Sequence, residues 1–256
     1  MSSLRNIFGK PTFVQGAGDI YPITLKHYDE FMDLAHIIML KKSQFPFKES
    51  DLAPYIDNPS ALTTLDYIAL NAVFEQNDEL LVGLKRIFEL VARDRVDFKL
   101  SDTFNQFSVA YFIGEANSNI IHSKNYEKVR KTILEQNLIA EPKEYANPLV
   151  AEWAAKAAEA KAANSKINID IESMISSLQI AMGQEAIFFE NFTIYQLYSA
   201  FARLGKFKEF DTELHLIGHS DKIGQVHFAE VTELMSDPNK EAFVDSSAIN
   251  NLSKQL

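Results

Sequence analysis

Apolar side chains recur at helical spacing along most of the chain, and this pattern restricts the fold more than any other feature. The widest stripe lies between residues 80 and 91 and comprises Leu80, Leu81, Leu84, Ile87, Phe88 and Val91. A stripe of this width is typical of a helix whose face is buried in a protein core. The sequence therefore predicts a mainly α-helical fold, arranged in one helical block or in two.

Helix ends are expected at residues that favour them. Thr24 is expected to cap a helix, because its hydroxyl can accept a hydrogen bond from a first-turn N–H. That helix should end near Lys41 and Lys42, whose charge complements the C-terminal carbonyls. Another helix should start at Thr193 and end at Gly205, a natural C-terminal cap. Further helices are expected to start at Ser60 and at Asn77 or Asp78, and to span about residues 51–56, 124–136, 207–217 and 225–235.

The N-terminal residues are expected to form a small β-hairpin. The segments Pro11–Gln15 and Asp19–Ile23 flank Gly16-Ala17-Gly18, and glycine tolerates the positive φ angles of tight turns. Residues 96–113 are ambiguous. In their first half, apolar and polar residues alternate as in a strand. The aromatic residues of the second half suit either a helix or a strand.

Two prolines, Pro142 and Pro148, bracket a short polar stretch and mark the best candidate boundary between blocks. We therefore expect an N-terminal block over residues 1–140, a helical block over residues 149–235 and a flexible polar tail over residues 236–256. Residues 151–166 are rich in alanine and have high helix propensity. They offer little besides Trp153 for burial, so we expect a weakly anchored helix there.

Composition excludes several classes of protein. With 25 basic and 35 acidic residues, the chain has a formal net charge of −10, which argues against nucleic-acid binding. It contains no cysteine, so disulfides, thiolate catalysis and cysteine-ligated metals are excluded. No apolar run reaches the roughly 18 residues of a membrane-spanning helix, and we expect a cytoplasmic protein without a membrane segment.

No motif of catalysis or of cofactor or metal binding stands out. His215 and His219 have the spacing of two helical metal ligands, but Gly218 lies between them, and surface histidines explain them better. Gly16-Ala17-Gly18 lacks the third glycine of a dinucleotide-binding loop. We therefore predict no catalytic, cofactor-binding or metal-binding residues and a non-enzymatic protein, with an enzyme of unrecognised type as the least favoured hypothesis.

The 19 phenylalanines and nine tyrosines are many for a helical chain of this length. Large aromatic side chains dominate both protein cores and protein interfaces. A bulky core is the favoured explanation, and an exposed binding surface is the alternative. The weakly anchored alanine-rich segment and the polar tail favour a protein that engages other proteins.

Two segments carry a family resemblance: GKPTFVQGAGDIYPITLKHYDEFM (residues 9–32) and FTIYQLYSAFARLGKFKEFD (residues 192–211). Both resemble phrases in proteins from the tail modules of bacteriophages that infect Gram-positive hosts. The family is that of the phage tail assembly chaperones. The resemblance implies a mostly helical, non-enzymatic protein that binds the tape-measure protein, keeps its apolar helices soluble and helps to recruit tail-tube subunits. Members of the family often exist as a short form and a frameshifted longer form. This chain is long for the family, and the part after Pro148 would correspond to the residues that the longer form adds.

These observations lead to a prediction about partner binding. A helical partner is expected to bind through apolar residues of segments 26–41, 62–92 or 167–204. Within the last segment, the predicted partner-binding residues are Ile167, Ile171, Met174, Ile175 and Leu178. The alternative is a structural virion protein of the tail, neck or baseplate, located in the virion tail and not in the host cytoplasm. Self-association is left open.

Overall fold

A computed structural model of the chain describes residues 4–52, 56, 58–103, 106–115, 118–141, 152, 153, 156, 169–217 and 234. Several of the sequence predictions lie outside these residues. They concern the boundary at residues 142–150, most of the alanine-rich segment, the helix at residues 225–235 and the tail at residues 236–256.

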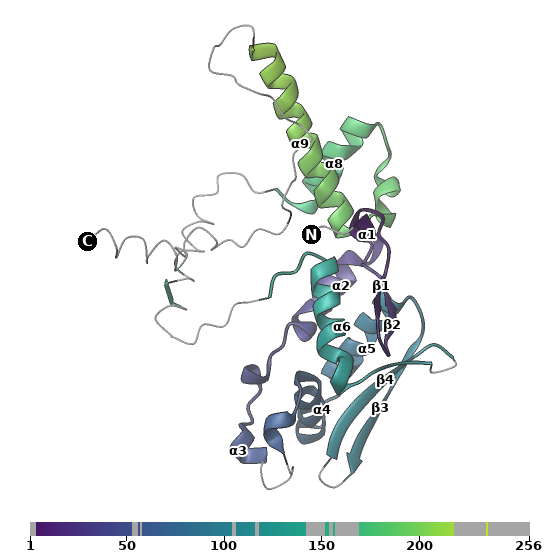
Figure 1. Cartoon of the computed structure of the whole chain (residues 1–256), viewed down its shortest axis with the longest axis vertical. Helices are drawn as coiled ribbons and strands as arrows, with labels where there is room; N and C mark the ends of the chain where they lie inside the picture. The colour runs from purple at the N-terminus through teal and green to yellow at the C-terminus, as the bar shows by residue number, and fades with distance from the viewer. Residues whose placement is uncertain are drawn as a thin grey trace, which may run out of the picture.

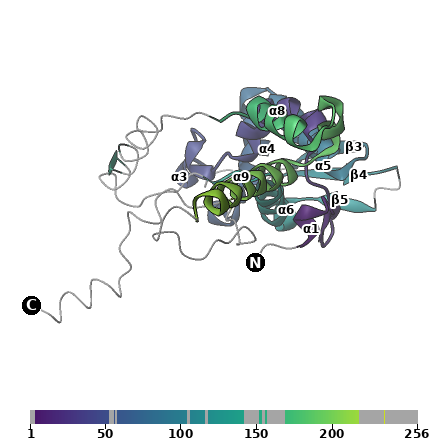
Figure 2. The same ribbon diagram turned by 90° about the horizontal axis from the view of Figure 1, so that it is seen from above.

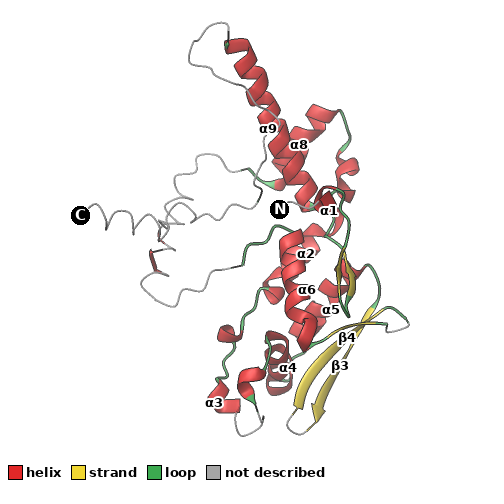
Figure 3. Cartoon of the chain, in the orientation of Figure 1, coloured by secondary structure: helices red, strands yellow, loops and turns green. Residues whose placement is uncertain are grey.

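The fold is mainly α-helical with two small antiparallel sheets, as predicted (Figures 1 and 3). After a short helix α1 (Leu4–Ile7), strands β1 (Thr12–Val14) and β2 (Gly18–Ile20) form the predicted hairpin, with Thr12 paired to Ile20. Gly16 and Gly18 both have a φ of 84°, which explains the two glycines of the turn. A Cβ atom on Gly18 would also lie 2.7 Å from the side chain of Asn119.

The remainder of the N-terminal block consists of helices on one face of a three-stranded sheet. The helices are α2 (Tyr28–Ile38), α4 (Thr64–Glu75), α5 (Glu79–Ala92) and α6 (Ser123–Gln136). Shorter helical turns are η1 (Leu25–His27), η2 (Lys42–Gln44), α3 (Glu49–Leu52) and η3 (Pro59–Ala61). The sheet has the order β3-β4-β5, with strands β3 (Val96–Thr103), β4 (Gln106–Ile113) and β5 (Asn119–Ile121).

The ambiguous residues 96–113 are therefore a pair of strands. Val109, Tyr111 and Ile113 are buried beneath the helices, whereas Asp97 and Lys99 of the paired strand are exposed. This two-residue alternation is the pattern of a sheet with one covered face. Among the aromatic residues of the second strand, Tyr111 is explained by burial of that face, whereas Phe112 lies on the opposite face.

The main core lies between this sheet and the helices, and it contains the whole stripe of residues 80–91. The centroid of the Phe88 ring lies 4.9 Å from that of Tyr111 and 6.4 Å from that of Tyr126, and both pairs are edge-to-face. The Tyr111 hydroxyl donates to the carbonyl of Leu81 at 3.1 Å. Burial raises the pKa of both tyrosines well above the ordinary value, so both hydroxyls remain neutral.

Several predicted helix boundaries are wrong. Thr24 precedes the short turn η1, makes no side-chain capping bond and pairs instead with Thr193 in an isolated β-bridge. Helix α2 ends at Ile38, before the two lysines. Ser60 lies in η3, and α4 starts after Thr63, because Thr63 and Asp66 cap the helix reciprocally.

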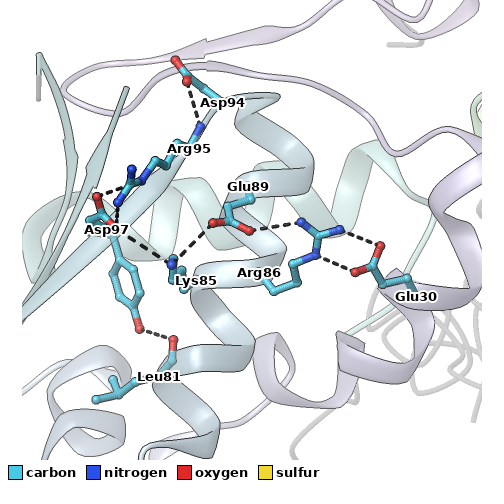
Figure 4. A network of polar contacts seen from close by, with 9 residues as sticks. Glu30, Leu81, Lys85, Arg86, Glu89, Asp94, Arg95 and Asp97 are labelled. Carbon is cyan, nitrogen blue, oxygen red and sulfur yellow. Dashed lines mark hydrogen bonds and ion pairs between the residues drawn. The ribbon is translucent and has the colours of Figure 1, made fainter. Parts of the chain in front are cut away.

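Polar contacts hold α2, α5 and β3 together at the surface (Figure 4). The guanidinium of Arg86 donates to both carboxylate oxygens of Glu30, at 2.5 and 3.0 Å, and to Glu89 at 3.1 Å. Lys85 lies 3.7 Å from Glu89 and 3.9 Å from Asp97. Because these groups are partly exposed, each pair contributes modestly to stability.

The C-terminal helical unit consists of α8 (Ile171–Met182), the 3-10 helix η4 (Ala186–Asn191) and α9 (Ile194–Leu216). Helix α8 ends at Gly183, which has a φ of 64°. Helix α9 begins after Thr193, as predicted, but it continues through Gly205 to Leu216. The prediction of two helices separated at Gly205 is therefore wrong.

Candidate partner-binding surface

The C-terminal helical unit is attached to the N-terminal block through backbone contacts. The N–H of Leu25 donates to the carbonyl of Phe192 at 2.8 Å, next to the bridge between Thr24 and Thr193. The side-chain amide of Gln196 donates to the carbonyl of Ile7 at 3.0 Å. Figures 1 and 2 show α8 and α9 together at one end of the molecule, with α1 beside α9.

This unit has a small core of its own. Five side chains are buried in it: Met174, Leu178, Phe189, Ile194 and Leu197. Leu25, Tyr28 and Leu138 of the N-terminal block pack against this cluster. Two helices and a 3-10 turn bury little apolar area alone, so we infer that the unit depends on the N-terminal block for stability.

The five predicted partner-binding residues have different environments. Met174 and Leu178 are 6% and 2% exposed and belong to the small core, so they contact α9 and η4 and not the solvent. Ile171 and Ile175 are half-buried and line a groove on the surface. Ile167 lies outside the described residues. Of the five, Ile171 and Ile175 are thus the ones that the structure places within reach of a partner.

The other two predicted binding segments contribute mainly to the main core. In segment 26–41, the residues Phe31, Ala35 and Ile38 are buried, as are Leu65 and Leu84 in segment 62–92. Their apolar stripes are explained by burial within the chain. These two segments expose three large apolar side chains, Met32, Phe74 and Val82, whereas the described part of segment 167–204 exposes five: Ile169, Ile180, Met182, Ile187 and Phe188.

Four of these exposed side chains lie between residues 180 and 188, which we call the α8–η4 turn. They are Ile180, Met182, Ile187 and Phe188, which are 87%, 46%, 61% and 44% exposed. Ile180 was missed by the sequence reasoning because it lies off the apolar stripe of α8. An isoleucine among the serines of the polar face is the signal that would have identified it.

The groove lined by Ile171 and Ile175 lies between α8, α9 and the start of α2, and has a volume of about 820 Å³. Its apolar lining also includes Ala186 and Tyr198. Its acidic lining residues are Asp29, Asp170 and Glu172. Tyr28 lies close by, where burial and then the nearby Tyr198 and Asp29 raise the pKa of its hydroxyl.

Asp170 has a structural role at this groove. Its carboxylate accepts from the backbone N–H of Ser173 at 2.7 Å and caps α8. Hydrogen bonds with Ser173 hold the pKa of Asp170 below its ordinary value. Neither Asp29 nor Glu172 forms an ion pair within the part of the chain that the structure describes.

Helix α9 extends beyond α8, as Figure 1 shows. Its far end carries a second group of exposed apolar side chains, of which Phe207, Leu214 and Ile217 are about half exposed, at 50%, 46% and 49%. Residues 169–217 therefore expose large apolar groups at the α8–η4 turn and at the far end of α9, and also at Ile169, just before α8.

The histidines considered as possible metal ligands are only partly within the described residues. The Nδ1 atom of His215 lies 2.6 Å from the carbonyl oxygen of Asp211, one helical turn away, whereas His219 and His227 lie outside the described residues. Among the described residues, no group of three or more His, Asp or Glu side chains is arranged to hold a metal ion. No helix in the same part of the chain has the length and apolar character needed to cross a membrane.

Comparisons with known proteins bear on the same unit. A family model described as the YomV second domain matches residues 160–233, a range that includes the described helices α8 and α9. No curated protein and no solved structure matches the chain. Less than a third of the chain is therefore similar to a known family, and that family is phage-derived.

Proposed function

We propose that this protein is a non-enzymatic phage tail assembly chaperone, which acts in the cytoplasm of the infected host and binds the tape-measure protein. The observation that carries the proposal is the exposure of large apolar side chains at the α8–η4 turn, within the segment that matches a phage-derived family. The resemblance of residues 9–32 and 192–211 to phage tail-module proteins supports it further.

The chemistry of the surface suits a partner with apolar helices. Exposed apolar side chains gathered at one place on a protein usually mark a binding site. A helical partner can place its apolar face against such a surface and remove both from water. The net charge of −10 would keep the complex soluble while tail-tube subunits are recruited.

A structural virion protein of the tail, neck or baseplate is the second candidate function. The far end of α9 favours this alternative, because a projecting helix with half-exposed Phe207, Leu214 and Ile217 is suited to permanent assembly. The two functions differ in where the protein is found after assembly.

Co-expression with the tape-measure protein of the same genome, followed by pull-down, tests the proposal. We expect capture of the tape-measure protein, and loss of capture when Ile180 and Ile187 are both replaced by serine. The matched control replaces Met32 and Val82, two exposed apolar residues of the N-terminal block, by serine. This control should still capture the tape-measure protein. Mass spectrometry of purified virions separates the two functions, since a fixed copy number in the particle would favour the structural protein.

A further inference from the structure

The groove between α8, α9 and the start of α2 combines an apolar floor with an acidic border. Ile171 and Ile175 are separated by one helical turn of α8 and face the groove with Tyr198 of α9. Asp170 and Glu172 border it at the start of α8, and Asp29 borders it from α2; among the described residues, no lysine, arginine or histidine lines it. An occupant must therefore bury apolar groups and neutralise negative charge at the same time.

Two of the three carboxylates are available to a ligand. Asp170 is occupied in capping α8 through the N–H of Ser173. Asp29 and Glu172 are exposed, and among the described residues no cation pairs with either of them. Cationic groups of a partner would gain these two ion pairs without breaking any that the described residues already form.

The groove continues along α8 toward the α8–η4 turn. Gln179 and Ala186 line the groove at that end, and Met182 lies one helical turn beyond Leu178 with 46% of its surface exposed. Along α8, the groove thus presents acidic and apolar groups side by side, since Ile171 lies between Asp170 and Glu172 in the sequence and Ile175 follows one turn later. A helical ligand that lies along α8 would meet both.

We propose that this groove binds an amphipathic helical segment of a partner protein, with an apolar stripe against Ile171 and Ile175 and basic side chains against Asp29 and Glu172. The identity of the partner as the tape-measure protein rests on the proposed function, whereas the charge and amphipathic character of the bound segment rest on the groove alone.

Two synthetic peptides test this inference on the full chain. Each has about 18 residues with leucines at helical spacing, and the remaining positions are lysines in one peptide and glutamates in the other. Fluorescence anisotropy measures the dissociation constants at low salt. We expect the lysine peptide to bind at least about tenfold more tightly than the glutamate peptide, and this preference to weaken in about 1 M salt, where charges are screened.

Paired variants locate the binding site. The double variant Asp29→Asn with Glu172→Gln removes two charges at the groove. It should weaken binding of the lysine peptide about fivefold, because each exposed ion pair contributes only a small free energy. The control Asp33→Asn with Glu79→Gln removes the same charge from a different hollow between α2 and α5, and should change binding less than about twofold. Ile175→Ala should weaken both peptides about threefold while helix content measured by circular dichroism is retained.

The outcomes separate this inference from the proposed function. Equal effects of the two charge variants, or equal binding of the two peptides, would overturn the groove as a site for basic segments. Capture of the tape-measure protein that is unaffected by Asp29→Asn with Glu172→Gln would overturn the tape-measure protein as the occupant of the groove, and the chaperone function would stand. Groove-dependent binding of the lysine peptide, without capture of the tape-measure protein, would support the groove and contradict the chaperone function.

Discussion

Residues 20–141 and residues 169–217 differ in what they do with large apolar side chains. In the longer region, the large apolar residues exposed among those described are Met32, Phe74 and Val82. In the shorter region, nine are exposed, four of them at the α8–η4 turn. Contiguous exposed apolar groups often mark an interaction site, which is why we propose the second region as the binding surface.

The two regions also differ in how they are stabilised. The N-terminal block closes a core between a sheet and several helices, in which Phe88, Tyr111 and Tyr126 are in contact. The C-terminal unit buries five side chains and depends on Leu25, Tyr28 and Leu138 of its neighbour. We therefore expect substitutions to destabilise the whole chain in the first region and mainly one part of it in the second.

The largest effect is expected from Phe88→Ala. Removal of this fully buried ring leaves a cavity beside two tyrosines and should lower the free energy of unfolding by about 3–5 kcal/mol. Urea unfolding followed by circular dichroism measures it. Val82→Ala, on an exposed position of the same helix, is the control and should cost less than about 0.5 kcal/mol. Similar losses for both variants would contradict a core at Phe88.

Leu178→Ala should destabilise the C-terminal unit by about 2–3 kcal/mol, because Leu178 is buried in the small core. Hydrogen exchange can locate the loss, since it reports local opening of separate parts of a protein. We expect faster exchange in α8 and α9 and unchanged protection in α5 and β4. Equal acceleration in α5 would mean that the two regions unfold as one unit.

Gly83→Ala tests the close packing of α2 against α5. A Cβ atom on Gly83 would lie 2.2 Å from Cδ1 of Ile37, a buried side chain. Overpacking costs about 1–3 kcal/mol, and the higher helix propensity of alanine offsets about 1 kcal/mol of it. We expect a net loss of about 1 kcal/mol, recovered when Ile37→Val removes the obstructing methyl group. A stabilised single variant would contradict this packing.

Glu30→Gln should have a smaller effect that depends on pH. The hydrogen bonds from Arg86 hold the pKa of Glu30 below its ordinary value of 4.5. The stabilisation is therefore present above pH 4.5 and is lost as the pH falls through the lowered pKa. Since the pair is partly exposed and screened by solvent, we expect the substitution to lower the free energy of unfolding by about 0.5–1 kcal/mol at neutral pH. Unfolding of both proteins across this pH range should converge in acid, and a constant difference would contradict the ion pair.

Local signals in the sequence predicted part of the local structure. The Gly16-Ala17-Gly18 turn and the start of α9 at Thr193 are confirmed, because positive φ angles and a capping threonine act within a few residues. Thr24 has the same side chain as Thr193 and is paired with it in a β-bridge, yet its side chain caps no helix. Such a long-range pairing leaves no mark in the neighbouring residues.

The candidate site was harder to predict for a related reason. Helical periodicity identifies an apolar face but does not say what covers it. Met174 and Leu178 are covered by the chain itself, whereas Ile180 and Ile187 are not covered by the residues that the structure describes. Asp29 reaches the groove from a segment about 140 residues away, and only the fold brings it next to Glu172.

The most direct test of this account measures stability and partner binding on the same variant. Ile180→Ser with Ile187→Ser should change the free energy of unfolding by less than about 1 kcal/mol, because both side chains are exposed. The same variant should lose capture of the tape-measure protein, whereas Met32→Ser with Val82→Ser retains it. If the first variant unfolds, or if it captures the partner as well as the unmodified chain does, the α8–η4 turn is not the binding surface.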